Sequence, residues 1–313
     1  MWKHVGKVKE ELINQLYLRM HHFYNFKQVL NTEVGICSVV GHDRVLMLIH
    51  TIASLFYFLK TNYSLYLVDD GTLTESDKMK INRIFTVKIQ SPDEGKSKII
   101  NKFGTNSKFV KYRLDKNNSL TRLKFDAYIL NSFKRAIYID SDVLIFNEPK
   151  EISKWLKQDS QNILCMLHDR KLFKSNLRQD LDHSIRVLLS NNGFPQLSPS
   201  FNSGLIALSN KDIFNAQLLD SIFNQFIGIG YDKAFTAEET ALSIVLKNSN
   251  SSITFLPKKK YLCPARMSEL SIALKMKKVA IHFISETKRE YPKHLMRLLF
   301  SNNLFLSVKS QLK

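Results

Sequence analysis

The chain has 313 residues, a formal net charge of +18 and an apolar fraction of 44%. This apolar fraction excludes a disordered polar chain, which could not bury enough surface to offset the loss of conformational entropy. The length is compatible with one large α/β domain that carries appendages. The three cysteines, Cys37, Cys165 and Cys263, form no CxxC pair. Their spacing argues against a disulfide framework and a thiolate zinc site, and favours a reducing compartment.

The N-terminal segment, residues 1–33, is basic and compatible with a helix, and we interpret it as an appendage. Its first residues contain no apolar core like that of a signal peptide, so we expect no export. The longest apolar run, Val45–Leu59, is shorter than the ~20 residues that a membrane-spanning helix needs. It is predicted to be a buried helix. Together these features predict a cytoplasmic protein.

From Val34 onward, short apolar runs alternate with helical patterns, which is typical of βαβ units around a mostly parallel sheet. Strands are predicted at 34–40 and 64–68, on either side of the helix at 45–59. Further along, the spacing predicts helices near 212–227 and 237–247 and strands at 163–167, 205–208, 253–256 and 279–283.

Between the second predicted strand and residue 133 the pattern is less regular. Thr74 and Asp77 fit a capping box that begins a helix. The polar stretch 91–118 is interpreted as a surface excursion. Apolar residues at helical spacing then predict a helix over 120–133, which leads into a further strand.

That strand contains the most informative motif, Tyr138-Ile139-Asp140-Ser141-Asp142, within an apolar run predicted to continue from Ile137 to Ile145. In an open parallel sheet, ligands bind beyond the carboxyl ends of the strands. Two carboxylates at such a place suit Mg²⁺ or Mn²⁺, which can bridge the phosphates of a nucleotide diphosphate. Without a cation, two carboxylates in a buried strand would be costly. An acidic pair at a strand end can also be a solvated turn, so the motif depends on its context.

Four further landmarks accompany the acidic motif in a fixed order. Lys124 lies 16 positions before Asp140. After the motif come Phe201-Asn202-Ser203-Gly204, then Glu238-Glu239-Thr240-Ala241-Leu242-Ser243, and finally Ile281-His282-Phe283 with Lys288 six residues after the histidine.

In this order the motifs resemble those of glycosyltransferase family 8, the glycogenin-like and lipopolysaccharide-galactosyltransferase-like enzymes. The resemblance covers roughly residues 34–290 and implies the α/β GT-A fold, a Rossmann-like, mostly parallel central sheet flanked by helices. The remaining segment, 291–313, is interpreted as a basic amphipathic helix. The resemblance also implies transfer of a hexose, with retention of configuration, to a saccharide, glycolipid or protein-linked acceptor. The implied donor is a nucleotide diphosphate sugar, with a UDP-hexose favoured.

The resemblance assigns the metal and the phosphates to one group of residues. Asp140, Asp142 and His282 would hold Mn²⁺ or Mg²⁺, and the metal would act as Lewis acid for the departing nucleotide diphosphate. Lys124 and Lys288 would neutralise phosphate charge. Further donor-site residues implied in the same way are Ser141 within the acidic motif and Gly41 and Asp43 at the base and ribose.

A second group would contact sugars. Asn202, with Ser203 and Gly204, would contact the donor sugar, and Glu238 and Glu239 would line it and stabilise positive charge in the transition state. Asp169 falls where related enzymes contact the acceptor sugar.

The sequence departs from the family pattern at two places. The family has Asp-Gln where this chain has Glu238-Glu239. A carboxylate in place of the Gln amide cannot donate hydrogen bonds, but it can stabilise or attack a developing oxocarbenium ion. Ser285 replaces the usual Gly after His282, and Arg289-Glu290 replaces the Pro-Trp that usually follows the lysine.

Each candidate residue also has a purely structural alternative. Thr236 and Glu239 can form a capping box, with Glu238 favouring the positive helix end. Asp43 can be a helix N-cap. The alternatives for the others are a core histidine for His282, a solvated face for Lys124, a turn for Asn202 and Gly204, and an ordinary loop carboxylate for Asp169.

The net charge of +18 predicts attraction to anions. The basic, Leu- and Phe-containing C-terminal segment suits a helix lying on the anionic cytoplasmic face of a membrane, and it suits a packed helix with a solvated basic face equally well. No nucleic-acid partner is expected, because no recognisable binding motif accompanies the charge. The oligomeric state and the acceptor are not predicted.

Two rival functions stay open at the level of sequence. A sugar nucleotidyltransferase on a similar sheet would release pyrophosphate instead of a nucleoside diphosphate. A non-catalytic protein on the same fold would bind a membrane or polyanion without metal-dependent affinity for nucleotides.

Overall fold

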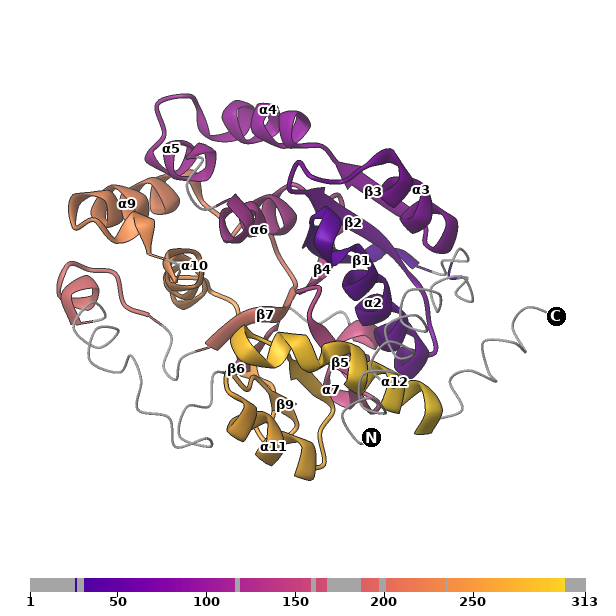
Figure 1. Cartoon of the computed structure of the whole chain (residues 1–313). Helices are drawn as coiled ribbons and strands as arrows, with labels where there is room; N and C mark the ends of the chain where they lie inside the picture. Colours follow the sequence, from indigo (N-terminus) through magenta and orange to yellow (C-terminus); the bar gives the residue numbers. More distant parts are fainter. Residues whose placement is uncertain are drawn as a thin grey trace, which may run out of the picture.

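The computed structural model describes residue 26 and the ranges 31–115, 119–158, 162–167, 187–196, 201–234 and 236–301. These residues form a mixed α/β structure with a large and a small sheet (Figure 1). The large sheet contains β1 (Asn31–Val40), β2 (Tyr63–Asp69), β3 (Val87–Gln90), β4 (Arg135–Ile139), β6 (Ile163–Leu167), β7 (Phe201–Leu208) and β8 (Ile253–Phe255). The small sheet contains β5 (Val143–Ile145), β9 (Tyr261–Leu262) and β10 (Ala280–His282).

Helices cover both faces of the large sheet (Figure 1). The described α-helices are α2 (Val45–Leu59), α3 (Glu75–Ile84), α4 (Pro92–Phe103), α5 (Lys108–Leu114), α6 (Ser119–Ile129), α7 (Lys150–Lys157), α9 (Ala216–Gly228), α10 (Ala237–Lys247), α11 (Met267–Lys275) and α12 (Tyr291–Ser301), of which α11 and α12 pack with the small sheet. The 3₁₀ helices in the described ranges are η2 (His42–Arg44), η4 (Tyr231–Lys233) and η5 (Ser285–Glu290).

The large sheet has the strand order β3-β2-β1-β4-β7-β6-β8. Every described pair in it is parallel except the two pairs made by β7, which runs opposite to its neighbours β4 and β6. The chain first builds outward from β1 to β3 and then returns to add β4 on the other side of β1. The carboxyl ends of β1 and β4 therefore meet at a topological switch point, the usual ligand-binding position in open α/β sheets.

Alternation along the strands divides the interior into two cores, because successive side chains of a strand point to opposite faces. Ile36 of β1 and Ile137 of β4 join the core beneath α2 and α3. Their neighbours Cys37 and Tyr138 join the core beneath α5, α6, α9 and α10. Strands that are apolar on both faces are expected in a sheet covered on both sides.

Much of the predicted element order is confirmed. The helix at 45–59 and the strand at 163–167 have the predicted limits. The Thr74/Asp77 capping box is present at the start of α3, where the threonine hydroxyl accepts from the Asp77 N–H. These segments carry their own local signals, which long-range packing did not override.

Two predictions are wrong. The 91–118 stretch is not a surface excursion: its described part contains α4 and α5, whose first residues follow the N-caps Ser91 and Ser107. The apolar strand does not run through the acidic motif either. It ends at Ile139 and resumes at Val143 in the other sheet, because the Val143 N–H bonds back to the Asp140 carbonyl in a tight turn.

Both terminal segments touch the core where they are described. Phe26 is buried, stacks on Phe85 and donates its N–H to the Ile84 carbonyl. At the other end, Leu295 and Leu298 of α12 are buried beside β10 and α11. These α12 side chains therefore pack against the protein itself, as in the packed-helix alternative. Among the described residues, we find no helix long and apolar enough to cross a bilayer.

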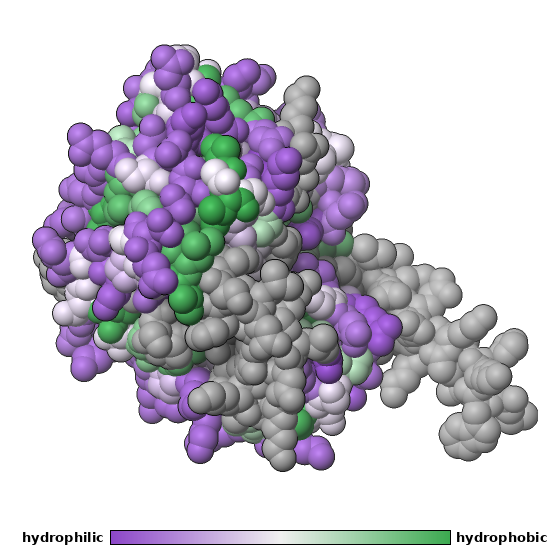
Figure 2. All heavy atoms as spheres, turned by 90° about the vertical axis from the view of Figure 1, so that its left-hand side faces the viewer, coloured by the Kyte–Doolittle hydropathy of each residue, from purple (hydrophilic) through white to green (hydrophobic). Residues whose placement is uncertain are grey.

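The face seen from the side of α9 and α10 is mostly hydrophilic, with apolar residues gathered in a few patches (Figure 2). Large apolar side chains that are exposed in the described part of the chain include Ile227 and Ile229 at the end of α9 and Ile272 on α11.

Candidate active site

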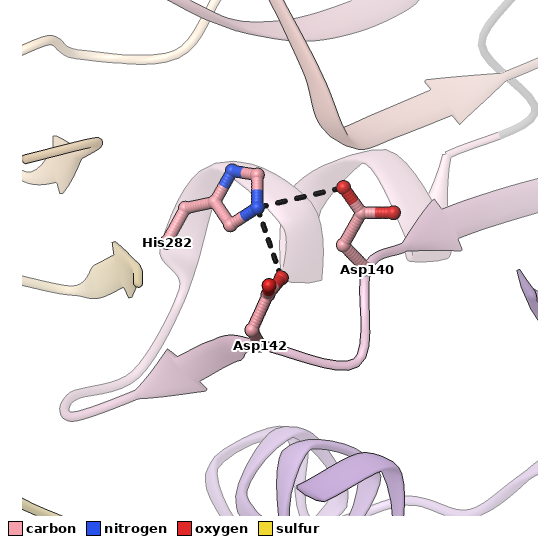
Figure 3. A group of neighbouring side chains, drawn as sticks. All are labelled: Asp140, Asp142 and His282. Carbon is pink, nitrogen blue, oxygen red and sulfur yellow. Dashed lines mark ion pairs between the residues drawn. The ribbon is translucent and has the colours of Figure 1, made fainter. Parts of the chain in front are cut away.

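The acidic motif joins the two sheets, and this junction creates a three-ligand cluster. Asp140 follows the end of β4, and Asp142 precedes β5. His282 ends β10, whose antiparallel pairing places it opposite Val143. The His282 Nε2 atom lies 3.0 Å from Asp142 Oδ1 and 3.4 Å from Asp140 Oδ2 (Figure 3). One ligand atom from each residue lies within 4.8 Å of the others, so the three could hold a metal ion.

The neighbours of His282 fix its tautomer in the form that a metal requires. Asn202 Oδ1 accepts a hydrogen bond from the Gly204 N–H at 2.9 Å, which identifies this atom as the amide oxygen. The same oxygen lies 2.8 Å from His282 Nδ1, so Nδ1 must carry a proton. In the neutral ring, Nε2 then keeps its lone pair and directs it at the two aspartates. Hard carboxylate oxygens with one imidazole nitrogen fit Mn²⁺ or Mg²⁺.

Gly204 is required at its position by this close approach. A Cβ atom there would lie 2.4 Å from His282 Nδ1 and 2.8 Å from Asn202 Oδ1. Its carbonyl accepts the Asp140 N–H at 2.8 Å, which locks β7 to the end of β4. The reversed direction of β7 thus brings Asn202, Ser203 and Gly204 to the switch-point edge.

Cationic side chains balance the acidic cluster. Lys124 of α6 donates to Asp140 Oδ2 at 2.9 Å and to Ser203 Oγ at 3.1 Å. Lys288 of η5 lies 2.5 Å from Asp142 Oδ2. Burial disfavours the charges on His282 and Asp142, yet their mutual attraction raises the pKa of the imidazole and lowers the pKa of the carboxyl. Binding of a divalent cation would therefore release the Nε2 proton.

The first turn of α10 contributes two carboxylates to the same edge. Glu238 is buried and accepts hydrogen bonds from the Tyr128 hydroxyl and the Ser203 hydroxyl, both at 3.1 Å. Burial raises the pKa of Glu238 to about 7, with Lys124 opposing the rise and Glu239 adding to it. Glu239 is half-buried and accepts the Ser203 N–H at 3.3 Å. The Thr236/Glu239 capping box is absent, since the Thr236 side chain makes no capping bond.

The remaining candidates lie at the edges of the site or outside the described residues. Gly41 directly follows β1 at the switch point, where a Cβ atom would clash with the Asp70 carboxylate. Asp43 lies exposed in η2 and does not cap α2, whose N-cap position is Arg44. Ser141 is buried in the turn, and its carbonyl accepts the Thr51 hydroxyl at 2.7 Å. Asp169 lies outside the described residues.

Sequence reasoning missed Tyr138, Tyr128 and Cys263, each of which contacts a candidate site residue. Tyr138 donates to Asp140 Oδ1 at 2.6 Å, and Tyr128 bonds Glu238. Both were detectable: Tyr138 is two residues before Asp140, and Tyr128 is four after Lys124 on the same helix. Cys263 Sγ lies 3.7 Å from His282 Nδ1. Nothing in its sequence context signals this contact, which depends on the pairing of β9 with β10.

Comparison with known proteins gives the fold a class. No protein-family model and no curated protein sequence matches the chain. Among solved structures, the bifunctional glycosyltransferase WbbM aligns with a TM-score of 0.56 and 12% identity. The alignment covers 91% of this chain and 53% of the WbbM chain. This chain thus spans about half the length of WbbM. The galactosyltransferase LgtC, solved with donor and acceptor sugar analogues, aligns with a TM-score of 0.52 and 12% identity, over 85% and 95% of the two chains. The protein has the GT-A glycosyltransferase fold.

Proposed function

We propose that the protein is a metal-dependent glycosyltransferase related to family 8, which transfers a hexose from a nucleotide diphosphate sugar to a saccharide or glycoconjugate acceptor. The observation that carries this proposal is the convergence of Asp140, Asp142 and His282 at the switch-point edge of a GT-A sheet. Asn202 holds the imidazole in its metal-binding tautomer, and Lys124 and Lys288 flank the two aspartates.

Each residue has a defined task in the proposed reaction. Asp140, Asp142 and His282 would hold Mn²⁺ or Mg²⁺, which supplies Lewis acidity to the diphosphate when bound. Lys288 is about one third exposed and can turn from Asp142 to a phosphate oxygen. Lys124 is more enclosed and would keep the charge of Asp140 partly balanced. We assign the base and ribose to the end of β1 at Gly41 and Asp43.

The bond changes follow from this placement. The bond between the anomeric carbon and the diphosphate oxygen breaks, and the electron pair leaves with the nucleoside diphosphate. The acceptor oxygen bonds to the anomeric carbon, and its proton passes to the departing phosphate oxygen. Glu239, held by the Ser203 N–H, would stabilise the positive charge that develops on the sugar. We propose retention of configuration and a UDP-hexose donor by resemblance to family 8.

The direct test is thermal unfolding of the purified protein with a panel of nucleoside diphosphates, with and without Mn²⁺. Ligands that bind the native state raise the melting temperature. We expect a metal-dependent rise for one nucleotide and its sugar conjugates. Asp142→Asn and Asp140→Asn should abolish the rise and the metal-dependent turnover while leaving the far-UV spectrum unchanged. Full turnover by both variants would refute the metal assignment.

The released product tests the reaction class. Donor cleavage by a glycosyltransferase releases a nucleoside diphosphate, whereas a nucleotidyltransferase releases pyrophosphate. Phosphorus NMR of the reaction mixture distinguishes the two products, and pyrophosphate would overturn the proposal.

A further inference from the structure

Three lysine-rich segments meet at one end of the small sheet. β5 is antiparallel to β10, and β9 is parallel to it, so the end of β5 lies beside the starts of β9 and β10. Residues 147–158 follow β5 and include α7, residues 257–260 precede β9, and residues 275–279 precede β10. Hydrogen bonds join them, because the Val279 N–H donates to the Lys260 carbonyl and the Asn147 amide donates to the Lys278 carbonyl.

We call the lysines of these segments the lysine cluster: Lys150, Lys154, Lys157, Lys258, Lys259, Lys260, Lys275, Lys277 and Lys278. The same segments contain two acidic residues, Glu148 and Glu151, which leaves a local net charge of +7 out of +18 for the chain. All of the lysines except Lys278 are exposed.

The cluster is built by the fold and is not scattered charge. Lys150, Lys154 and Lys157 are spaced by four and three residues, which places them on one side of α7, while Ile152 and Trp155 face the core. Glu151 pairs with Lys260 at 3.1 Å and ties α7 to the 257–260 turn. On α11, Ile272 is 45% exposed and lies one turn before Lys275 on the same helix face.

The cluster is separate from the candidate metal site. Asp142 and His282 lie at the opposite end of the same small sheet, where β5 begins and β10 ends. Strands of three residues separate the two ends by about 10 Å. A partner that binds the cluster would therefore contact the end of the small sheet that lies away from the candidate metal site.

We propose that the lysine cluster docks the protein on an anionic phospholipid bilayer. Lysine ammonium groups are strongly hydrated point charges that suit a diffuse layer of lipid headgroups. Arginine, which is favoured where individual phosphates are recognised by paired hydrogen bonds, is absent from all three segments. The exposed Ile272 beside Lys275 supplies an apolar side chain that can enter the headgroup boundary. Leu295, Met296 and Leu298 of α12 cannot serve this purpose, because they are buried in the protein.

The test is flotation of the full chain with vesicles of phosphatidylcholine alone or with one third phosphatidylglycerol. We expect binding to the anionic vesicles that weakens with added salt. A triple variant, Lys154→Gln, Lys259→Gln and Lys277→Gln, takes one exposed lysine from each segment. Each lysine near an anionic surface contributes about fivefold to the affinity for the membrane. The triple variant should therefore bind the anionic vesicles about 100-fold more weakly than the unaltered protein.

A second triple variant provides the matched control, since it removes the same charge elsewhere. The control combines Lys88→Gln, Lys96→Gln and Lys111→Gln. These lysines belong to β3, α4 and α5, which lie at the other side of the molecule from α7 and α11 (Figure 1). The control variant should lose far less affinity. Equal losses in the two triples would overturn the proposal, because the attraction would then follow net charge alone. So would a lack of binding to the anionic vesicles.

Two further measurements distinguish bilayer docking from polyanion binding and from the proposed transferase function. Ile272→Ser should weaken vesicle binding. If binding is unchanged in Ile272→Ser and polyphosphate competes fully for the protein, the cluster is a polyanion site and the bilayer proposal fails. The metal-dependent thermal shift with nucleotides should be the same in both triple variants and in the unaltered protein. Failure of that shift in the unaltered protein concerns the proposed function and leaves the docking result standing.

Discussion

Replacing Gly204 by alanine tests the central geometry of the site with one methyl group. The added Cβ would lie 2.3 Å from His282 Cε1 and 2.4 Å from His282 Nδ1, about 1 Å short of ordinary contact. Since β7 is hydrogen-bonded to Asp140 through the Gly204 carbonyl, the imidazole must move. Overpacking of this kind lowers the free energy of unfolding by about 1–3 kcal/mol.

The displaced ring would also lose its alignment with Asn202 and the two aspartates. Loss of the hydrogen bond that orients a metal-binding histidine typically weakens metal binding by about 10- to 100-fold. We therefore expect Gly204→Ala to reduce the Mn²⁺-dependent stabilisation by about 1.4–2.7 kcal/mol at saturating nucleotide, a few degrees in melting temperature. Titration calorimetry with Mn²⁺ and the preferred nucleoside diphosphate measures the affinity directly.

Two variants control this experiment. Gly228 of α9 has open space around its Cα, so Gly228→Ala should stabilise the protein slightly and leave metal binding unchanged. His282→Ala removes the ring that Gly204→Ala would push, so the two destabilisations should not add in the double variant. If Gly204→Ala retains both its melting temperature and its Mn²⁺ affinity, the reasoning about this contact is wrong.

The remaining predictions concern electrostatics and backbone strain. The folded-state pKa of Glu238, about 7, lies above its ordinary value of 4.5, so its protonated form favours folding, and this contribution is lost as the pH rises from 4.5 through 7. Ionisation of the buried Glu238 carboxyl lowers the free energy of unfolding by about 3 kcal/mol at pH 8. Glu238→Gln should remove this cost, so urea denaturation should give the variant a higher free energy of unfolding at pH 8 and a smaller difference at pH 5. An equal increase at both pH values would contradict the burial argument. Ser285 and Lys60 have φ values of 49° and 55°. Ser285→Gly and Lys60→Gly should each raise the free energy of unfolding by about 0.5–1 kcal/mol, measured by chemical denaturation, and a loss in either would contradict the strain argument.

Local signals explain which parts of the fold could be predicted. The 45–59 helix is mostly apolar, and its C-cap Lys60 has the left-handed conformation. The helix after Ser91 had a readable start as well, an N-cap followed by Pro92, but the polar composition of the stretch obscured it. The short strand 87–90 was missed because four residues at the sheet edge give little periodicity.

The landmarks in the sequence include residues that the fold brings together, but their order could not show how these residues contact one another. Whether Asn202 and His282 share a hydrogen bond depends on two pairings, β7 with β4 and β10 with β5, whose partners are far apart in sequence. The network from Glu238 through Ser203 to Lys124 depends in addition on how α10 and α6 lie against β7. Such contacts arise from tertiary packing and leave no trace in local spacing.

The turn at Asp140-Ser141-Asp142 has a mechanical consequence. One aspartate follows a strand of the large sheet, the other precedes a strand of the small sheet, and His282 reaches the pair from a third strand. A cation bound by Asp140, Asp142 and His282 would link the end of the large sheet to the small sheet. Amide hydrogens of β5 and β10 should then exchange more slowly with Mn²⁺ bound, since opening of the small sheet would require the ion to leave. Occupancy of the candidate metal site would in this way set the rigidity of the small sheet.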